Sequence, residues 1–112
     1  MPTEVTHRGV DGATIVYIDG DLTTNTSPEV EEEILEILEE QAGNLIINVE
    51  KVNFIASTGL RVILALGKKM SGKGQKLMVC SMNATTKSVF NMSGFSKLFP
   101  TFDTEDEAIR SQ

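Results

Sequence analysis

Short apolar runs alternate with longer amphipathic segments along this chain, and that alternation restricts its fold more than any other feature of the sequence. The runs at 13–20, 45–49 and 76–80 are rich in apolar and β-branched residues, which is typical of strands. Between them, the segments 28–42 and 60–70 repeat apolar residues at helical spacing. Strands that alternate with helices predict an α/β protein whose inner strands are parallel and joined by right-handed crossovers.

The remaining elements are predicted from local signals. Residues 4–8 alternate weakly and are followed by the turn residues Asp11-Gly12, so we expect an antiparallel edge strand beside 13–20. Ser27 before Pro28 is typical of a capped helix start, and Gly43 predicts the end of that helix. The elements predicted further along are a helix ending before Gly72, a helix over 84–92 ending near Gly94, a short strand at 99–102, and a terminal helix over 104–109 capped by Thr104.

Length and composition indicate one folded unit that carries negative charge. A chain of 112 residues matches the usual size of one domain, so we expect a single domain over 1–112. Ten basic and sixteen acidic residues give a net charge of −6, which opposes binding to nucleic acid or anionic lipid. We interpret the two acidic runs, 29–40 and 103–107, as solvent-exposed helix faces, with recognition of a basic partner as the alternative.

Cysteine content and hydropathy bear on where the protein acts. The one cysteine cannot form an internal disulfide, and no apolar leader opens the chain, so we expect a cytoplasmic protein. The longest apolar stretches, such as 62–66, are far shorter than the roughly 20 residues that a membrane helix needs. We therefore expect no membrane insertion.

Groups suited to catalysis or metal binding are few. His7 is the only histidine and stands near the chain start, and Cys80 follows an apolar run where a cysteine usually packs as a small hydrophobe. We interpret Asp19 and Asp21 as loop residues, with a divalent cation site as the alternative, and residues 72–74 as a turn rather than a phosphate-binding loop. These observations predict a protein that is not an enzyme and holds no cofactor or metal.

The segment 53–61 places two hydroxyl residues between a predicted strand and the next helix. From the residues alone, Ser57 is interpreted as a helix cap that accepts a backbone N–H, and Gly59 as a site of close packing. A phosphate on Ser57 would add about −1.5 to −2 charges near the positive end of the helix dipole. The fold would tolerate that charge, whereas a partner surface docked there would meet a bulky dianion.

The chain as a whole resembles the STAS domain family, the sulfate-transporter and anti-sigma-factor-antagonist domains, and in particular the free-standing antagonists. The resemblance covers nearly all of the chain. It rests on IDGDL at 18–22, NVEKVNFI at 48–55 leading into STGL at 57–60, and MSGFSKLF at 92–99. It implies a central mixed sheet of four to five strands with about four helices packed mainly on one face.

The resemblance also implies a function, that of an anti-sigma-factor antagonist controlled by phosphorylation. A serine at the position of Ser57 is phosphorylated in this family by a partner serine kinase that is also the anti-sigma factor, and a serine phosphatase reverses the modification. The unphosphorylated form captures the kinase and so releases a sigma factor for transcription. The partner-binding residues implied are Asp19, Asp21, Thr23, Thr24, Ala56, Ser57, Thr58, Gly59, Leu60 and Arg61.

Three differences from the family pattern leave alternatives open. The family commonly has aspartate where this chain has Ala56, and often another acid where it has Thr23, so Thr58 is the alternative phosphorylation site. The same differences favour an alternative function, a phosphorylation-independent scaffold subunit of a signalling or lipid-transport complex. Arg61 replaces a small residue and is interpreted as solvent-exposed, with contact to a partner or to a phosphate on Ser57 as the alternative.

Overall fold

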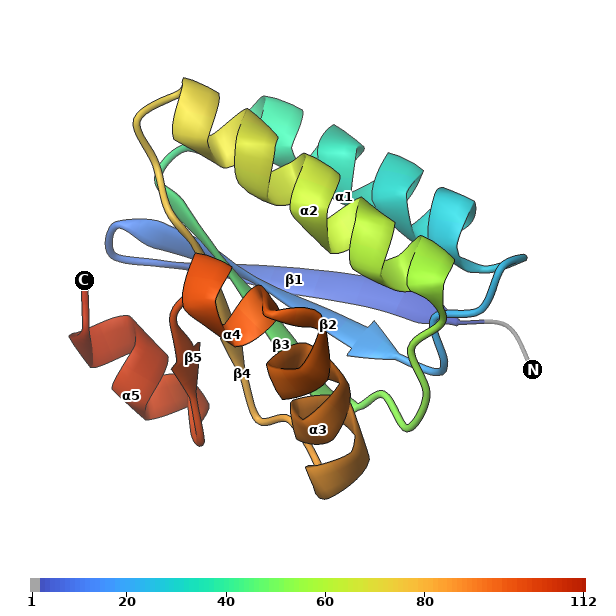
Figure 1. Cartoon of the computed structure of the whole chain (residues 1–112). Coiled ribbons are helices and arrows are strands. Elements are labelled where there is room, and N and C mark those ends of the chain that lie inside the picture. Colours follow the sequence, from blue (N-terminus) through green and yellow to red (C-terminus); the bar gives the residue numbers. More distant parts are fainter. Residues whose placement is uncertain (1–2) are drawn as a thin grey trace.

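The computed structural model describes residues 3–112 and contains one five-stranded sheet in the order β1-β2-β3-β4-β5 (Figure 1). The first two strands are antiparallel and all later neighbours are parallel. The strands are β1 Glu4–Val10, β2 Ala13–Asp19, β3 Asn44–Lys51, β4 Leu77–Cys80 and β5 Thr101–Phe102. The helices are α1 Ser27–Glu40, α2 Ser57–Gly72, α3 Ala84–Ser93, α4 Phe95–Leu98 and α5 Glu105–Arg110.

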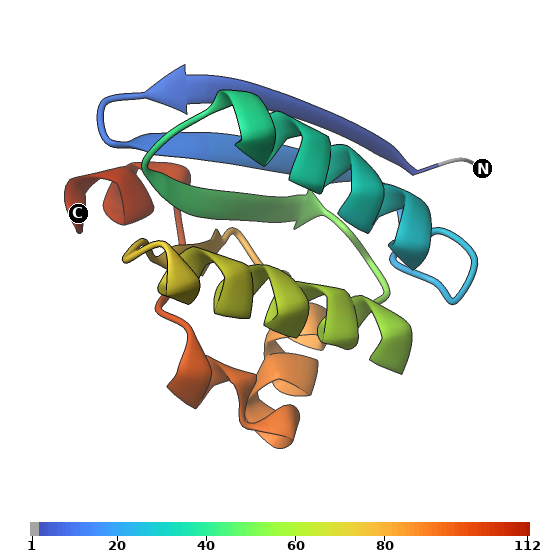
Figure 2. The same ribbon diagram turned by 90° about the horizontal axis from the view of Figure 1, so that it is seen from above.

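The helices form two unequal layers around the sheet. The larger core lies under α1 to α4, and the smaller core lies on the opposite face under α5 (Figures 1 and 2). This arrangement confirms the predicted α/β fold with a mixed sheet and helices mainly on one face. The structure adds α4, which the sequence did not predict, because four residues are too few to show a helical repeat. Among residues 3–112, no helix is long and apolar enough to cross a membrane.

The central strand β3 shows why the sheet needs cover on both sides. Successive side chains of a strand point to opposite faces, so Leu45 and Ile47 enter the larger core while Ile46 enters the smaller one. Ala108 of α5 closes the smaller core over Ile46 and is fully buried. The continuous apolar run of β3 therefore reflects burial on both faces of the sheet, as is usual for inner parallel strands.

The start of α1 differs from the prediction, because Ser27 is not its cap. Ser27 is buried inside the first turn, and its hydroxyl donates to the Thr23 carbonyl at 2.6 Å. Thr23 and Thr26 instead exchange reciprocal bonds: the Thr23 N–H donates to Thr26 Oγ1 at 2.9 Å, and the Thr26 N–H donates to Thr23 Oγ1 at 3.1 Å. This pattern satisfies two backbone donors, as in a capping box.

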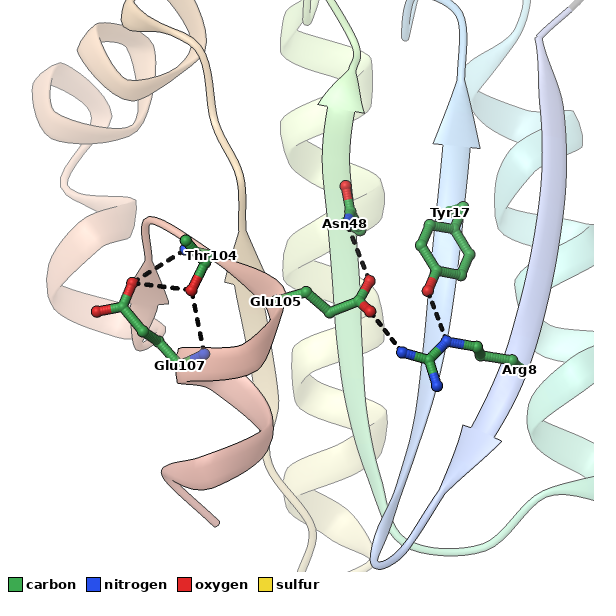
Figure 3. A network of polar contacts seen from close by, with 6 residues as sticks. All are labelled: Arg8, Tyr17, Asn48, Thr104, Glu105 and Glu107. Carbon is green, nitrogen blue, oxygen red and sulfur yellow. Dashed lines mark hydrogen bonds and ion pairs between the residues drawn. The ribbon is translucent and has the colours of Figure 1, made fainter.

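The ends of α2 and α3 and the start of α5 agree with the signals in the sequence. Residues 72–74 form the turn that ends α2, where the N–H groups of Lys73 and Gly74 donate to Met70 and Ser71 carbonyls. These donors are occupied, which confirms a turn rather than a phosphate cradle. Gly94 ends α3 with a left-handed φ of 82°, and Thr104 caps α5 in a capping box with Glu107 (Figure 3).

A polar network fastens α5 to the strands on the smaller face (Figure 3). Glu105 accepts from Arg8 Nη2 at 2.6 Å and from Asn48 Nδ2 at 3.1 Å, while Arg8 Nε donates to the Tyr17 hydroxyl at 2.9 Å. Partial burial alone would raise the pKa of Glu105, but the Tyr17 hydroxyl, the Arg8 guanidinium and the Asn48 amide outweigh it and lower the pKa. The charged form of Glu105 is therefore the stabilising one.

Gly43→Ala is expected to lower the free energy of unfolding by about 1–3 kcal/mol. Gly43 has a φ of +96°, and an added Cβ would collide with the backbone carbonyl of Gly12. Gly72→Ala is the matched control, because its Cβ would meet nothing within 4 Å. Urea denaturation of both variants measures the difference, and equal stabilities would contradict the close approach of the two turns.

Acid is expected to remove the contribution of Glu105 to stability. Because the folded pKa is lowered, that contribution is complete above the ordinary glutamate pKa of about 4.3 and is lost as the pH falls through the folded pKa. Denaturation at a series of pH values should therefore show a steeper acid loss in the wild type than in Glu105→Gln. Identical pH profiles would show that the network adds nothing to stability.

Candidate functional site

The β2–α1 loop and the β3–α2 loop meet at the carboxyl ends of their strands and are joined through the backbone. Leu22 and Ile55 form an isolated parallel bridge, in which the Leu22 N–H donates to Phe54 O at 2.9 Å. The Ala56 N–H then donates to Leu22 O at 2.8 Å. Leu22 and Ile55 are both buried, so this junction is anchored in the larger core. The fold thus brings together the two segments that were predicted to bind a partner.

Asp21 braces the same junction with its side chain. Asp21 Oδ1 accepts from the backbone N–H groups of Asn53 and Phe54, both at 3.2 Å. The Asp21 carbonyl also accepts from Thr26 Oγ1 at 2.7 Å, which ties the brace to the start of α1. Asp19 is different, since it lies exposed and makes only a 3.9 Å ion pair with Lys51. This difference supports a structural role for Asp21, whereas Asp19 is the last residue of β2 and not the loop residue that was predicted.

Ser57 is the first residue of α2 and is exposed, but it does not cap the helix. The cap position is held by Ala56 in an extended conformation, without any side-chain hydrogen bond, so the capping interpretation of Ser57 was wrong. Backbone hydrogen bonds to Leu22 hold the β3–α2 loop in this conformation. The Ser57 hydroxyl therefore makes no capping hydrogen bond. Gly59 confirms the close packing expected of it, because an added Cβ would lie 2.8 Å from the Leu22 Cβ.

The neighbouring hydroxyl of Thr58 has a different environment. Thr58 Oγ1 is buried and has no hydrogen-bond partner within the part of the chain that the structure describes. Thr58 and Arg61 line a hollow of about 300 Å³ between the first turns of α1 and α2, where Glu31 lies on the α1 side. Arg61 itself is exposed, as expected, while Leu60 is half-buried against the larger core.

A larger hollow of about 760 Å³ lies on the other side of the junction. Asp19, Asp21 and Thr23 line it, whereas Thr24 is exposed on the loop nearby. The sequence analysis did not select the other residues of this wall, although Gly20, Lys51 and Asn53 lie within the motifs at 18–22 and 48–55. These residues are Thr3, Gly20, Asn25, Thr26, Lys51 and Asn53.

Phe54 is a second feature of the site that the sequence analysis did not select. It is 52% exposed although it belongs to the β3–α2 loop and its carbonyl joins that loop to Leu22, three residues before Ser57. A large aromatic side chain left in solvent is unusual, and exposed aromatic residues often anchor protein interfaces. An aromatic residue in a loop between a buried strand and a helix was the sequence signal for it.

The remaining candidate groups lie away from this site. Cys80 is buried, and burial raises the pKa of its thiol to about 11, so it is a packed neutral thiol as expected. His7 is exposed on the edge strand β1. Among residues 3–112, no three histidine, cysteine or acidic side chains gather closely enough to hold a metal ion.

The five-stranded mixed sheet and its helices agree with the comparisons to known proteins. The family model for the STAS domain matches residues 4–108. The chain belongs to the STAS domain family. It is 33% identical to the anti-sigma F factor antagonist of Paenibacillus polymyxa over 104 residues, which cover 92% of this chain and 86% of that protein. The chain is thus a homologue of anti-sigma factor antagonists, which are binding proteins rather than enzymes.

Solved structures of the family share the fold of this STAS domain. An anti-sigma factor antagonist from Mycobacterium paratuberculosis superposes with a TM-score of 0.89 at 26% identity, covering 97% of this chain and 92% of that one. The antagonist SpoIIAA in its unphosphorylated form gives a TM-score of 0.79 at 20% identity, with 95% and 93% coverage. Bacillus SpoIIAA in its phosphorylated form gives a TM-score of 0.73 at 19% identity, covering 96% of this chain and 98% of that one.

Asp21→Ala is expected to lower the free energy of unfolding by about 1–2 kcal/mol, because two backbone N–H groups lose a charged acceptor. Hydrogen exchange should also become faster at the amides of Asn53 and Phe54. Asp19→Ala removes the same charge two residues earlier, at the end of β2, and should change stability little, since its ion pair is exposed. Equal effects of the two substitutions would contradict the bracing role of Asp21.

Proposed function

We propose that this STAS domain is an anti-sigma-factor antagonist that is switched by phosphorylation of Ser57. In the unphosphorylated form it binds an anti-sigma factor that is also a serine kinase, and so frees a sigma factor in the cytoplasm. A serine phosphatase restores the binding form. The single observation that carries the proposal is an exposed serine that does not cap its helix, on the first turn of α2, where the family resemblance implies a phosphorylated serine.

Accessibility supports Ser57 over Thr58 as the modified residue. A kinase must bring its nucleotide phosphate to the hydroxyl oxygen, and the Thr58 oxygen is buried between α1 and α2. The Ser57 side chain is exposed and takes no part in capping the helix. Solved structures of SpoIIAA in its unphosphorylated and phosphorylated forms support the same kind of modification in this family.

Electrostatics explains how a phosphate would change binding without unfolding the domain. The first turn of α2 presents the positive end of a 16-residue helix, so a dianion on Ser57 is stabilised there. Arg61 lies one turn further along and forms no ion pair among residues 3–112, so its guanidinium is free to contact that phosphate. A partner docked on the same surface would instead lose contact area and meet a new negative charge.

The proposed partner surface is larger than Ser57 alone. It extends from the Asp19 to Thr24 loop across Phe54 to the first turns of α2, because the Leu22–Ile55 bridge holds these segments together. We assign Phe54 to this surface as an aromatic anchor. The predicted residues Ala56, Gly59 and Leu60 contribute chiefly by fixing the loop, since Gly59 is buried and the other two are half-buried.

Ser57→Asp is expected to weaken binding to the cognate kinase at least about tenfold, or about 1.4 kcal/mol. Ser57→Ala should still bind but should accept no phosphate from that kinase, whereas Thr58→Val should still be phosphorylated. Ser88→Asp is the matched control, because it adds the same charge at an exposed serine of α3. Calorimetry and phosphopeptide mass spectrometry over 53–61 measure both effects, and tight binding by Ser57→Asp would refute the charge switch.

A phosphorylation-independent scaffold subunit of a signalling or lipid-transport complex is the second candidate. Two observations favour it: Ala56 offers no carboxylate beside Ser57, and the Thr23 hydroxyl is already engaged with Thr26. This candidate predicts a fixed partner that co-purifies and no phosphate on Ser57 or Thr58 in cells. Phosphate on either residue in the native protein would exclude it.

A further inference from the structure

Charge is divided very unevenly along this chain. Residues 51–102 hold eight of the ten basic residues and none of the sixteen acidic ones, although they make up nearly half of the sequence. The net charge of −6 therefore conceals a strongly basic half. Such a division produces local fields that the net charge does not describe.

The fold gathers this basic half on one side of the molecule. Residues 51–102 include α2, α3 and α4, and Figure 2 shows α2 lying between α1 and the α3–α4 pair. The neighbour α1 carries seven glutamates and no basic residue. The C-terminal half of α2 carries Lys68 and Lys69 and α4 carries Lys97, whereas Lys87, the one lysine of α3, pairs with Asp103.

An apolar groove opens within this basic surface, between α2 and α4. It has a volume of about 260 Å³. Leu98 on its rim is 59% exposed, and Met92 on the adjoining α3 is 86% exposed. These are two of the three large apolar side chains that are exposed among residues 3–112. The groove is lined by Leu64, Gly67, Lys68, Ser71, Leu98 and Phe99.

One lysine lines the groove and another precedes its rim residue Leu98, and neither has an ion-pair partner within the described chain. Lys68 lines it from α2, and Lys97 precedes Leu98 on α4. The ion pairs within residues 3–112 are Arg8–Glu105, Lys51–Asp19 and Lys87–Asp103, so neither lysine is neutralised by a neighbour. An apolar opening with an unpaired lysine in its wall and a second lysine next to its rim residue in sequence fits an acidic segment that carries an apolar side chain.

We propose that the groove between α2 and α4 docks an acidic segment of a partner protein, which inserts an apolar side chain between Leu64 and Leu98. The volume is below the usual 300–1,000 Å³ of a pocket for a small molecule and suits one or two side chains. A second copy of this chain offers acidic charge on α1, but the apolar residues of α1, such as Ile34 and Leu38, are buried in its own core. A distinct partner is therefore the occupant.

This docking surface is separate from the Ser57 surface. The α2 residues that line the groove, from Leu64 to Ser71, follow Ser57 by seven to fourteen residues, which corresponds to about 10–20 Å of helix. A segment bound between α2 and α4 leaves the first turn of α2 open. The domain thus has two surfaces for protein partners, and the second does not depend on phosphorylation.

The test uses the full chain and a fluorescent 18-residue amphipathic peptide with leucines on one face and glutamates on the other. Anisotropy should show binding that weakens as salt is raised, and a peptide with lysine in place of glutamate should bind at least about tenfold more weakly. Amide shifts in NMR should map to Leu64, Lys68 and Leu98. Equal binding of both peptides, or no binding, would overturn the proposal.

Variants decide whether the groove itself is responsible. Leu98→Asp and the double variant Lys68→Glu/Lys97→Glu should each weaken binding at least about tenfold. Arg110→Glu on α5 and Ser57→Asp should bind like the wild type, which separates this result from that of the proposed switch. Two other outcomes would overturn the proposal if no peptide binds. A dimer that the wild type forms and the double variant loses would assign the surface to a second copy, and binding to phosphatidylserine vesicles would assign it to a membrane.

Discussion

The junction between Leu22 and Ile55 is the contact on which the site depends. These two residues extend the parallel sheet by one bridge beyond β2 and β3, and their side chains are buried in the larger core. The Asp21 carboxylate holds the same two loops from the solvent side. Because Gly59 packs directly on Leu22, the first turn of α2 is fixed to this junction as well. The exposed serine therefore stands on a rigid base.

A rigid base determines what kind of switch the domain can be. A phosphate on Ser57 would meet solvent, the helix dipole and Arg61, and no buried group would have to move to receive it. The modification then changes the surface that a partner sees, rather than the fold. The proposed docking groove between α2 and α4 is not altered by this modification. Two independent surfaces on one small domain would let it hold one partner while it exchanges another.

The fold was largely predictable because apolar periodicity reports burial. The run at 45–49 showed a strand covered on both faces, and the glutamate-rich segment from Pro28 showed a helix with one buried face. The position of α5 on the opposite face was not predictable, since a helix of six residues does not encode which side of a sheet it covers. The family resemblance supplied the phosphorylation hypothesis, which periodicity alone could not.

Helix starts were predicted less well, for a physical reason. A serine before a helix shows that a start is near but not which hydroxyl accepts the free N–H groups. At α1 the bonds are made by Thr23 and Thr26, and Ser27 points into the structure instead. At α2 the backbone contact with Leu22 places Ala56 at the cap, so Ser57 moves into the helix. Both differences arise from tertiary contacts that a local pattern does not contain.

The central claim is that phosphorylation of Ser57 changes the surface and leaves the fold intact. The most direct test compares ¹H–¹⁵N NMR spectra of the protein with serine and with phosphoserine at position 57, the latter introduced during synthesis. We predict shifts confined to the residues around Ser57 and to the β2–α1 loop joined to it, with the sheet and α5 unchanged. Shifts spread through β3, β4 and α5 would show that the phosphate reorganises the core and would contradict a surface switch.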